Sequence, residues 1–123
     1  MTMRPMLKLE VELLDGKKLF PLALIDSGAD QTMVNMGYAK RIGIDLTNAP
    51  KRPMNGIEGT GAKETFVAPF KLKFVNWNEE LIVPACFIDS PSVNILIGEE
   101  GFFDAYRIKF EKDHDSFEIS KKR

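Results

Sequence analysis

The first patterned segment of the chain alternates between apolar and polar residues. In the range Leu7–Leu13, a leucine or valine stands at every second position, with lysine or glutamate between. A period of two predicts a strand with one buried face. Asp15-Gly16 follows, and this dipeptide favours a tight hairpin turn. The apolar run Leu19–Ile25 comes next and predicts a strand buried on both faces.

The rest of the chain is divided by turn-forming residues into further short apolar segments. Strands are predicted at Gln31–Val34, Phe66–Val75, Leu81–Ile88 and Val93–Ile97, and a final hairpin pairs Ile108 and Phe110 with Phe117 and Ile119. Short helices are predicted over Met36–Ile42, between Asn35 and Gly43 as caps, and over Gly98–Ala105. Asn48–Pro53 is predicted as a loop, and the glycine-rich Gly56–Gly61 as a hairpin tip. Many short strands with regular turns indicate a mostly β, barrel-like domain.

Two segments of the chain resemble each other. Pro21–Ser27 and Pro84–Ser90 share Pro, Ile, Asp and Ser in register. Two similar buried strands that end in turns explain this pattern, and so does a duplicated half-domain. The copies diverge at the next position, where the first has Gly28 and the second has Pro91. Only the first copy therefore keeps an unrestricted turn after its Asp-Ser pair.

Composition narrows the possible functions. The 123 residues form one domain, with a core over about residues 7–119. The 17 basic and 18 acidic residues give a net charge of −1, which disfavours binding to nucleic acid or to an anionic membrane. A single cysteine (Cys86) and a single histidine (His114) exclude an internal disulfide and a Cys/His zinc site, and we expect no metal and no cofactor. The start of the chain has no signal-peptide pattern and no apolar run reaches membrane-spanning length, so a cytoplasmic location is expected.

The segment Leu24–Asp30, with the sequence LIDSGAD, is the main candidate for chemistry. The preceding apolar residues are expected to bury Asp26, and an unpaired buried carboxylate is costly. Two neighbouring carboxylates share a proton, so that one activates a water and the other protonates a carbonyl oxygen. Within one chain, the candidates for the second carboxylate fail, because Asp89 is not followed by the matching turn and Asp30 is too close in sequence to lie opposite Asp26. A twofold dimer, by contrast, brings together the Asp26 carboxylates of two chains. The alternative is a simple Asx turn between two strands.

LIDSGAD resembles the active-site signature of the retroviral-type aspartic proteases, the retropepsins. The apolar run Ile95–Gly98, with a short helix after it, is similar to the second signature of that family. Gly56–Gly61 falls where the family has its flap, and the repeat matches the pseudo-symmetric halves of the family. The resemblance extends over roughly Leu7–Ile119 and is closer to bacterial and cellular members than to viral ones.

The resemblance implies a closed β-barrel of the acid protease fold that acts as a C2 homodimer. Such an enzyme hydrolyses peptide or protein substrates with an activated water. Asp26 would be the catalytic aspartate, Ser27 would link the two active-site loops across the dimer axis, and Gly28 would let the substrate backbone approach. The remaining implied site residues are Ala29 and Asp30 in the loop, Ile95, Leu96, Ile97 and Gly98 as its support, and Gly56, Ile57, Glu58, Gly59 and Thr60 in the flap.

One position departs from the family pattern. Retropepsins often carry an arginine just after the glycine of the second signature, where it pairs with the acid at the Asp30 position. Here Glu99 and Glu100 follow Gly98, so the candidates to pair with Asp30 are Arg4, Arg41 and Arg107. This departure keeps a second function open, that of a non-catalytic peptide-binding or assembly module. A phosphate-binding loop at Gly56–Gly61 is rejected, because no Gly-Lys-Ser/Thr and no long helix follow.

Overall fold

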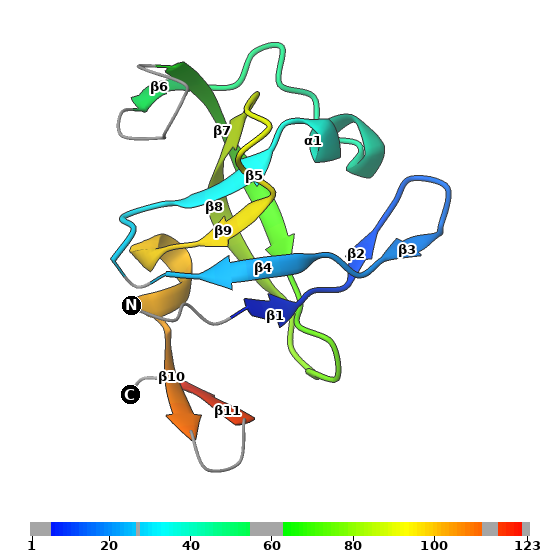
Figure 1. The fold of residues 1–123 in the computed structure, drawn as a ribbon. Coiled ribbons are helices and arrows are strands. Elements are labelled where there is room, and N and C mark those ends of the chain that lie inside the picture. Colours follow the sequence, from blue (N-terminus) through cyan, green and yellow to red (C-terminus); the bar gives the residue numbers. More distant parts are fainter. Residues whose placement is uncertain (1–5, 27, 55–62, 112–115, 122–123) are drawn as a thin grey trace.

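The computed structural model describes residues 6–26, 28–54, 63–111 and 116–121, and the statements below concern these residues. Strands make up most of this part of the chain, and its two helical segments are short (Figure 1). The elements are β1 (Met6–Lys8), β2 (Val11–Glu12), β3 (Lys18–Leu19), β4 (Leu22–Ile25), β5 (Thr32–Asn35), α1 (Gly37–Ile42), β6 (Lys51–Met54), β7 (Lys63–Leu72), β8 (Leu81–Ile88), β9 (Ile95–Ile97), the helical turn η1 (Glu99–Phe103), β10 (Tyr106–Glu111) and β11 (Ser116–Lys121).

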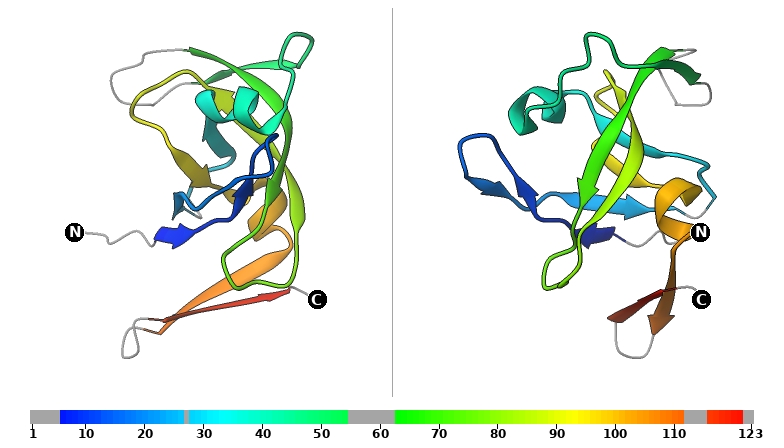
Figure 2. Two further views of the ribbon diagram at one scale, coloured as in Figure 1. Left: turned by 90° about the vertical axis from the view of Figure 1, so that its right-hand side faces the viewer. Right: turned by 180° about the vertical axis from the view of Figure 1, so that it is seen from behind.

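A seven-stranded sheet forms the body of the protein, in the order β1-β4-β9-β5-β8-β7-β6. Two pairs in this sheet are parallel, β4 with β9 and β5 with β8, and all the others are antiparallel. The long β7–β8 hairpin crosses the shorter strands obliquely (Figure 2). The hydrophobic core lies between this hairpin and the shorter strands. Its buried side chains include Leu9, Val11, Ala23, Ile25, Val34, Phe70, Leu72, Val83, Phe87, Ile97 and Phe102.

Apart from β6, the strand order is symmetric about the central pair β9–β5. In the first half of the chain β1 pairs with β4, and the next strand, β5, pairs with β8 from the second half and is followed by α1. In the second half β7 pairs with β8, and the next strand, β9, pairs with β4 from the first half and is followed by η1. Met33 of β5 is paired with Leu96 of β9 at the centre of this arrangement. These two residues are as far apart in the sequence as Asp26 and Asp89, the two acids of the repeat. This topology favours a duplicated half-domain as the origin of the sequence repeat.

The prediction of a mostly β chain with short helices is confirmed, but a closed barrel is not found among the described residues. There β1 and β6 stand at the two edges of the sheet. A single bridge joins Leu9 to Phe74, just beyond the ends of β1 and β7. It is flanked by hydrogen bonds from the Glu10 amide to the Lys73 carbonyl (2.8 Å) and from the Val75 amide to the Lys8 carbonyl (3.0 Å). The sheet therefore curls back on itself without a continuous closing ladder.

One strand prediction and one loop prediction were wrong. The run Leu19–Ile25 is broken between β3 and β4, and only one face of β4 is covered. Ala23 and Ile25 are buried, whereas Leu22 is 46% exposed. The predicted loop Asn48–Pro53 instead runs into strand β6, which includes Pro53. Proline is tolerated there because β6 is an edge strand, where a missing N–H breaks no ladder on the open side.

The helix α1 ends at Gly43 as predicted, but it begins one residue later than predicted, with Met36 in place of Asn35 at the N-cap position. The side-chain oxygen of Asn35 accepts a hydrogen bond from the Gly37 amide (2.9 Å). Gly43 ends the helix in the left-handed conformation at φ 85°, which a residue without Cβ adopts at little cost. In the described part of the chain, no helix has the length and apolar character needed to cross a membrane.

The hairpin β10–β11 forms a separate two-stranded sheet with the predicted pairing, in which Ile108 faces Ile119 and Phe110 faces Phe117. An aromatic cluster holds it to the body. Tyr106 stacks on Phe102 (5.6 Å between ring centroids) and meets Trp77 edge to face (5.2 Å). The Tyr106 hydroxyl also donates a hydrogen bond to Glu79 (2.8 Å). Lys121 of β11 pairs with the same carboxylate (3.1 Å), so both strands of the hairpin are joined to the β7–β8 connection at Glu79.

Candidate active site

Asp26 lies in a tight turn directly after β4. Its backbone amide donates to the Ile97 carbonyl (2.9 Å), and its carbonyl accepts from the Ala29 amide (3.1 Å). Its carboxylate oxygen Oδ1 accepts from the Gly28 amide (3.0 Å). The side chain is half-buried rather than fully buried as expected, because it continues the uncovered face of β4. The turn therefore fixes a carboxylate that is still accessible. Ser27 lies outside the described residues.

The segment after β9 makes backbone hydrogen bonds to this turn. Glu99 donates its amide to the Ala29 carbonyl (2.8 Å), and Glu100 donates its amide to the Asp30 carbonyl (3.0 Å). Gly98 is in direct backbone contact with the turn, because a Cβ at this position would lie 2.8 Å from the Ala29 carbonyl oxygen. Real Cβ atoms do not approach backbone so closely. The glycine is thus required by its contact with the loop that follows Asp26.

Thr32 is a supporting residue that the sequence interpretation missed. Its side chain is fully buried, and its hydroxyl accepts a hydrogen bond from the Gly98 amide (3.2 Å). A buried amide without a partner is costly, so this hydroxyl helps to hold the two loops together. A threonine in a predicted strand is ordinary, and no feature of a single sequence distinguishes this one.

A row of apolar side chains lies on the same face of the sheet as Asp26. Register pairs Met6 with Leu24, Leu24 with Leu96, and Leu96 with Met33. All four are at least partly exposed, whereas the residues that alternate with them point into the core. Because side chains two apart in a strand share a face, Leu24 lies on the side of the Asp26 carboxylate. The sequence interpretation gave Leu96 only a supporting role and missed the row.

The acid of the repeat, Asp89, cannot come close to Asp26 within one chain. The strand β4 runs parallel to β9, β9 antiparallel to β5, and β5 parallel to β8. Strands β4 and β8 therefore run in opposite directions, and the residues that follow them stand at opposite ends of the sheet. The turn after β8 is also different, since Asn35 donates hydrogen bonds to the Ser90 (2.9 Å) and Val93 (2.7 Å) carbonyls.

No described arginine pairs with the Asp30 carboxylate. Arg41 and Arg107 both lack such a contact, and Arg4 lies outside the described residues. Arg52 of β6 instead pairs with Glu100 at 3.5 Å, with side chains that are 40% and 43% exposed. A pair this exposed contributes little to stability. It nevertheless connects β6 to the segment that is hydrogen-bonded to the Asp26 turn.

The predicted flap residues, Gly56, Ile57, Glu58, Gly59 and Thr60, lie outside the described residues. The strands on either side of them are described. β6 and β7 pair antiparallel from Lys51 with Phe66 to Met54 with Lys63.

The symmetric half-domains and the supported Asp26 turn define a retropepsin-like fold. No family model and no curated protein matches the chain. Among solved structures, the retroviral protease-like domain of Ddi1 from Leishmania major is similar, with 19% identity and a TM-score of 0.57, over 93% of this chain and 87% of that one. A retropepsin-like aspartic protease from Rickettsia conorii is also similar, with 17% identity and a TM-score of 0.52, over 97% of this chain and 95% of that one. The resemblance noted in the sequence is confirmed at the level of the fold.

Proposed function

We propose that this chain is an aspartic endopeptidase that acts as a homodimer, with one Asp26 from each copy. The observation that carries the proposal is the position of Asp26, accessible in its turn while the repeat-related Asp89 stands at the far end of the sheet. Peptide hydrolysis by carboxylates needs two of them close together. A twofold axis beside the Asp26 turn supplies the second one.

The chemistry then follows from two carboxyl groups that share one proton. The ionised group takes a proton from a water while the water oxygen bonds to the peptide carbonyl carbon. The protonated group gives its proton to the carbonyl oxygen, which forms a tetrahedral diol. Proton transfer to the amide nitrogen and cleavage of the C–N bond release the amine and the acid. The hydrogen bond from the Gly28 amide to Asp26 holds the carboxylate in position for this step.

The proposed substrate is a polypeptide with apolar side chains near the bond that is cut. Met33, Leu24 and Leu96 supply an apolar surface on the face of Asp26, and burial of such side chains is the main source of affinity there. The proposed flap would cover the bound peptide from the other side.

Digestion of a diverse peptide mixture at several pH values, read by mass spectrometry, tests this function. Wild-type protein is compared with Asp26→Asn and with Asp89→Asn, a control that changes the same residue type in the other copy of the repeat. The proposal expects cleavage by wild type and Asp89→Asn, and none by Asp26→Asn. Cleavage that survives Asp26→Asn would refute it, as would a complete absence of cleavage by wild-type dimer.

A second candidate function is a non-catalytic, retropepsin-like module that binds peptides or assembles with other chains. The absence of an arginine partner for Asp30 among the described residues favours it. Sedimentation separates the two candidates, because a strict monomer cannot place two Asp26 carboxylates together. A monomer that binds peptides without cutting them would establish the second function.

A further inference from the structure

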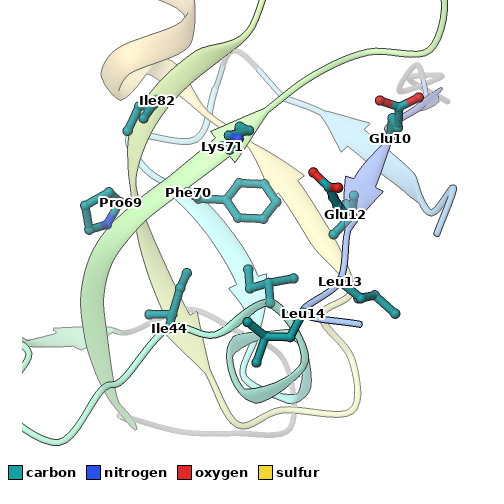
Figure 3. A pocket seen from close by; sticks show the side chains of 11 residues that line it. Glu10, Glu12, Leu13, Leu14, Ile44, Pro69, Phe70, Lys71 and Ile82 are labelled. Atoms are coloured by element: carbon teal, nitrogen blue, oxygen red, sulfur yellow. The ribbon is translucent and has the colours of Figure 1, made fainter. Parts of the chain in front are cut away.

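The single cysteine of the chain, Cys86 of β8, lies on the face of the sheet that carries Asp26. Register pairs it with Met33, and Met33 belongs to the apolar row on that face. Ile82, earlier in β8, has the same orientation and is 64% exposed at the rim of an open apolar groove (Figure 3). Cys86, by contrast, is only 2% exposed. Other side chains on this face therefore cover its thiol.

Gln31 is one of the side chains that cover the thiol. Cys86 donates a hydrogen bond from Sγ to Gln31 Oε1 (3.3 Å). The backbone of Gln31 is held as well, since a Cβ on Gly98 would lie 2.5 Å from the Gln31 carbonyl oxygen. The side chain of Gln31 thus extends from the loop that follows Asp26 to the end of the apolar row. Because both of its ends are fixed, it can bind a ligand at a smaller entropic cost.

The contact with Cys86 decides which end of the Gln31 amide is free. Oε1 accepts the thiol hydrogen, whereas Nε2 makes no hydrogen bond within the described residues. A primary amide nitrogen carries two N–H donors, and the side chain of Gln31 is only half-buried. Gln31 is therefore a fixed hydrogen-bond donor beside an apolar surface. A few such polar groups among apolar ones are what give binding sites their specificity.

We propose that Gln31 determines specificity in the proposed endopeptidase, by donating a hydrogen bond from Nε2 to the side-chain carbonyl oxygen of a substrate glutamine or asparagine. Cys86 is a positioning residue, because it acts only through Gln31. A substrate carboxylate is disfavoured at the same place by the charges of Asp26 and Asp30. This inference rests on the proposed function at Asp26, and it adds a polar requirement to the apolar preference stated there.

The test uses pairs of peptides that are identical except for glutamine or methionine at one position near the bond that wild type cuts. These two side chains have similar lengths, so each pair isolates the effect of the amide. We expect a position at which wild type prefers glutamine about threefold or more in kcat/KM, which is the effect of one net hydrogen bond. Gln31→Met should reduce this ratio to about one. Asn78→Met is the matched control, since it removes an exposed amide of the β7–β8 connection, and it should leave the ratio unchanged.

Two substitutions of Cys86 separate its positioning role from its packing. Cys86→Ser keeps a donor for Gln31 Oε1 and should keep the preference for glutamine. Cys86→Ala removes the donor, so the Gln31 amide can turn and the preference should fall at least about twofold. A change in packing alone would alter the cleavage of both peptides of a pair and leave their ratio as it is in wild type.

The outcomes distinguish this inference from the function on which it rests. Cleavage by wild type with no preference for glutamine at any position would overturn the inference and leave the proposed function intact. A preference that survives Gln31→Met would do the same. Equal ratios for Cys86→Ser and Cys86→Ala would refute the positioning role of the thiol. No cleavage of any peptide by the wild-type dimer would overturn the proposed function, and this inference with it.

Discussion

Replacing Gly98 with alanine tests how the Asp26 turn is held. Gly98 has φ −109° and ψ −166°, a conformation open to any residue, so alanine causes no backbone strain. The cost comes only from contact. The new Cβ would lie 2.5 Å from the Gln31 carbonyl oxygen and 2.8 Å from the Ala29 carbonyl oxygen. Both atoms belong to the backbone of the loop that follows Asp26, so that loop itself must move.

The size of this effect follows from two contributions. Forcing an extra carbon into a packed site costs about 1–3 kcal/mol. A shifted loop also weakens the hydrogen bonds Gly98–Thr32 and Glu99–Ala29, at about 0.5–1.5 kcal/mol each. A total of about 3 kcal/mol is expected, which lowers the melting temperature of a chain of this size by about 10 °C.

Gly16→Ala is the matched control, because its cost comes from backbone strain and not from a close contact. Gly16 has φ 86° and no atom within 4 Å of an added Cβ, so alanine costs only the strain of a positive φ, about 1 kcal/mol. Urea unfolding followed by Trp77 fluorescence measures both variants. If Gly98→Ala costs no more than Gly16→Ala, the contact between Gly98 and the active-site loop does not exist as described.

Three further predictions concern contacts away from the carboxylate. Thr32→Val should cost about 1–3 kcal/mol in urea unfolding, because it leaves the buried Gly98 amide without an acceptor, and Thr32→Ser should restore most of it. Hydrogen bonds from Tyr106, the larger cause, and from Lys121 hold the pKa of Glu79 below its usual 4.5. The ionised carboxylate therefore stabilises the fold above pH 4.5, and this stabilisation is lost as pH falls through the lowered pKa. The difference in melting temperature between wild type and Glu79→Gln should therefore vanish at acidic pH, and a constant difference would contradict this contact. Arg52→Ala should change the unfolding free energy by less than about 0.5 kcal/mol, since its ion pair is exposed; a larger loss would show that the pair holds β6.

Local features of the structure could be predicted from the sequence because each depends on neighbouring residues. The alternation in Leu7–Leu13 matches burial of Leu9, Val11 and Leu13. Asp15-Gly16 forms the turn between β2 and β3, with Gly16 at φ 86°. The register of β10 with β11 is the one that the apolar positions of the sequence predicted.

Features that depend on distant residues could not be predicted. The parallel pairs β4–β9 and β5–β8 join strands from different halves of the chain, and no local pattern encodes that choice. The uncovered face of β4 is a consequence of this pairing, which is why its apolar run appeared to be a strand buried on both faces. The family pattern predicted an arginine as the partner of Asp30. The ion pair that forms instead joins Arg52 of β6 to Glu100 of η1, and no local pattern encodes a contact between residues so far apart in the chain.

The central claim is that one active site uses Asp26 from two chains, and subunit mixing tests it most directly. Wild type and Asp26→Asn are mixed at fixed total concentration, allowed to exchange subunits, and assayed with a peptide that wild type cleaves. If each site needs two copies of Asp26, activity per wild-type chain falls in proportion to the wild-type fraction, because mixed dimers are inactive. Activity per wild-type chain that stays constant at every ratio would show that a single Asp26 suffices, and would contradict the account.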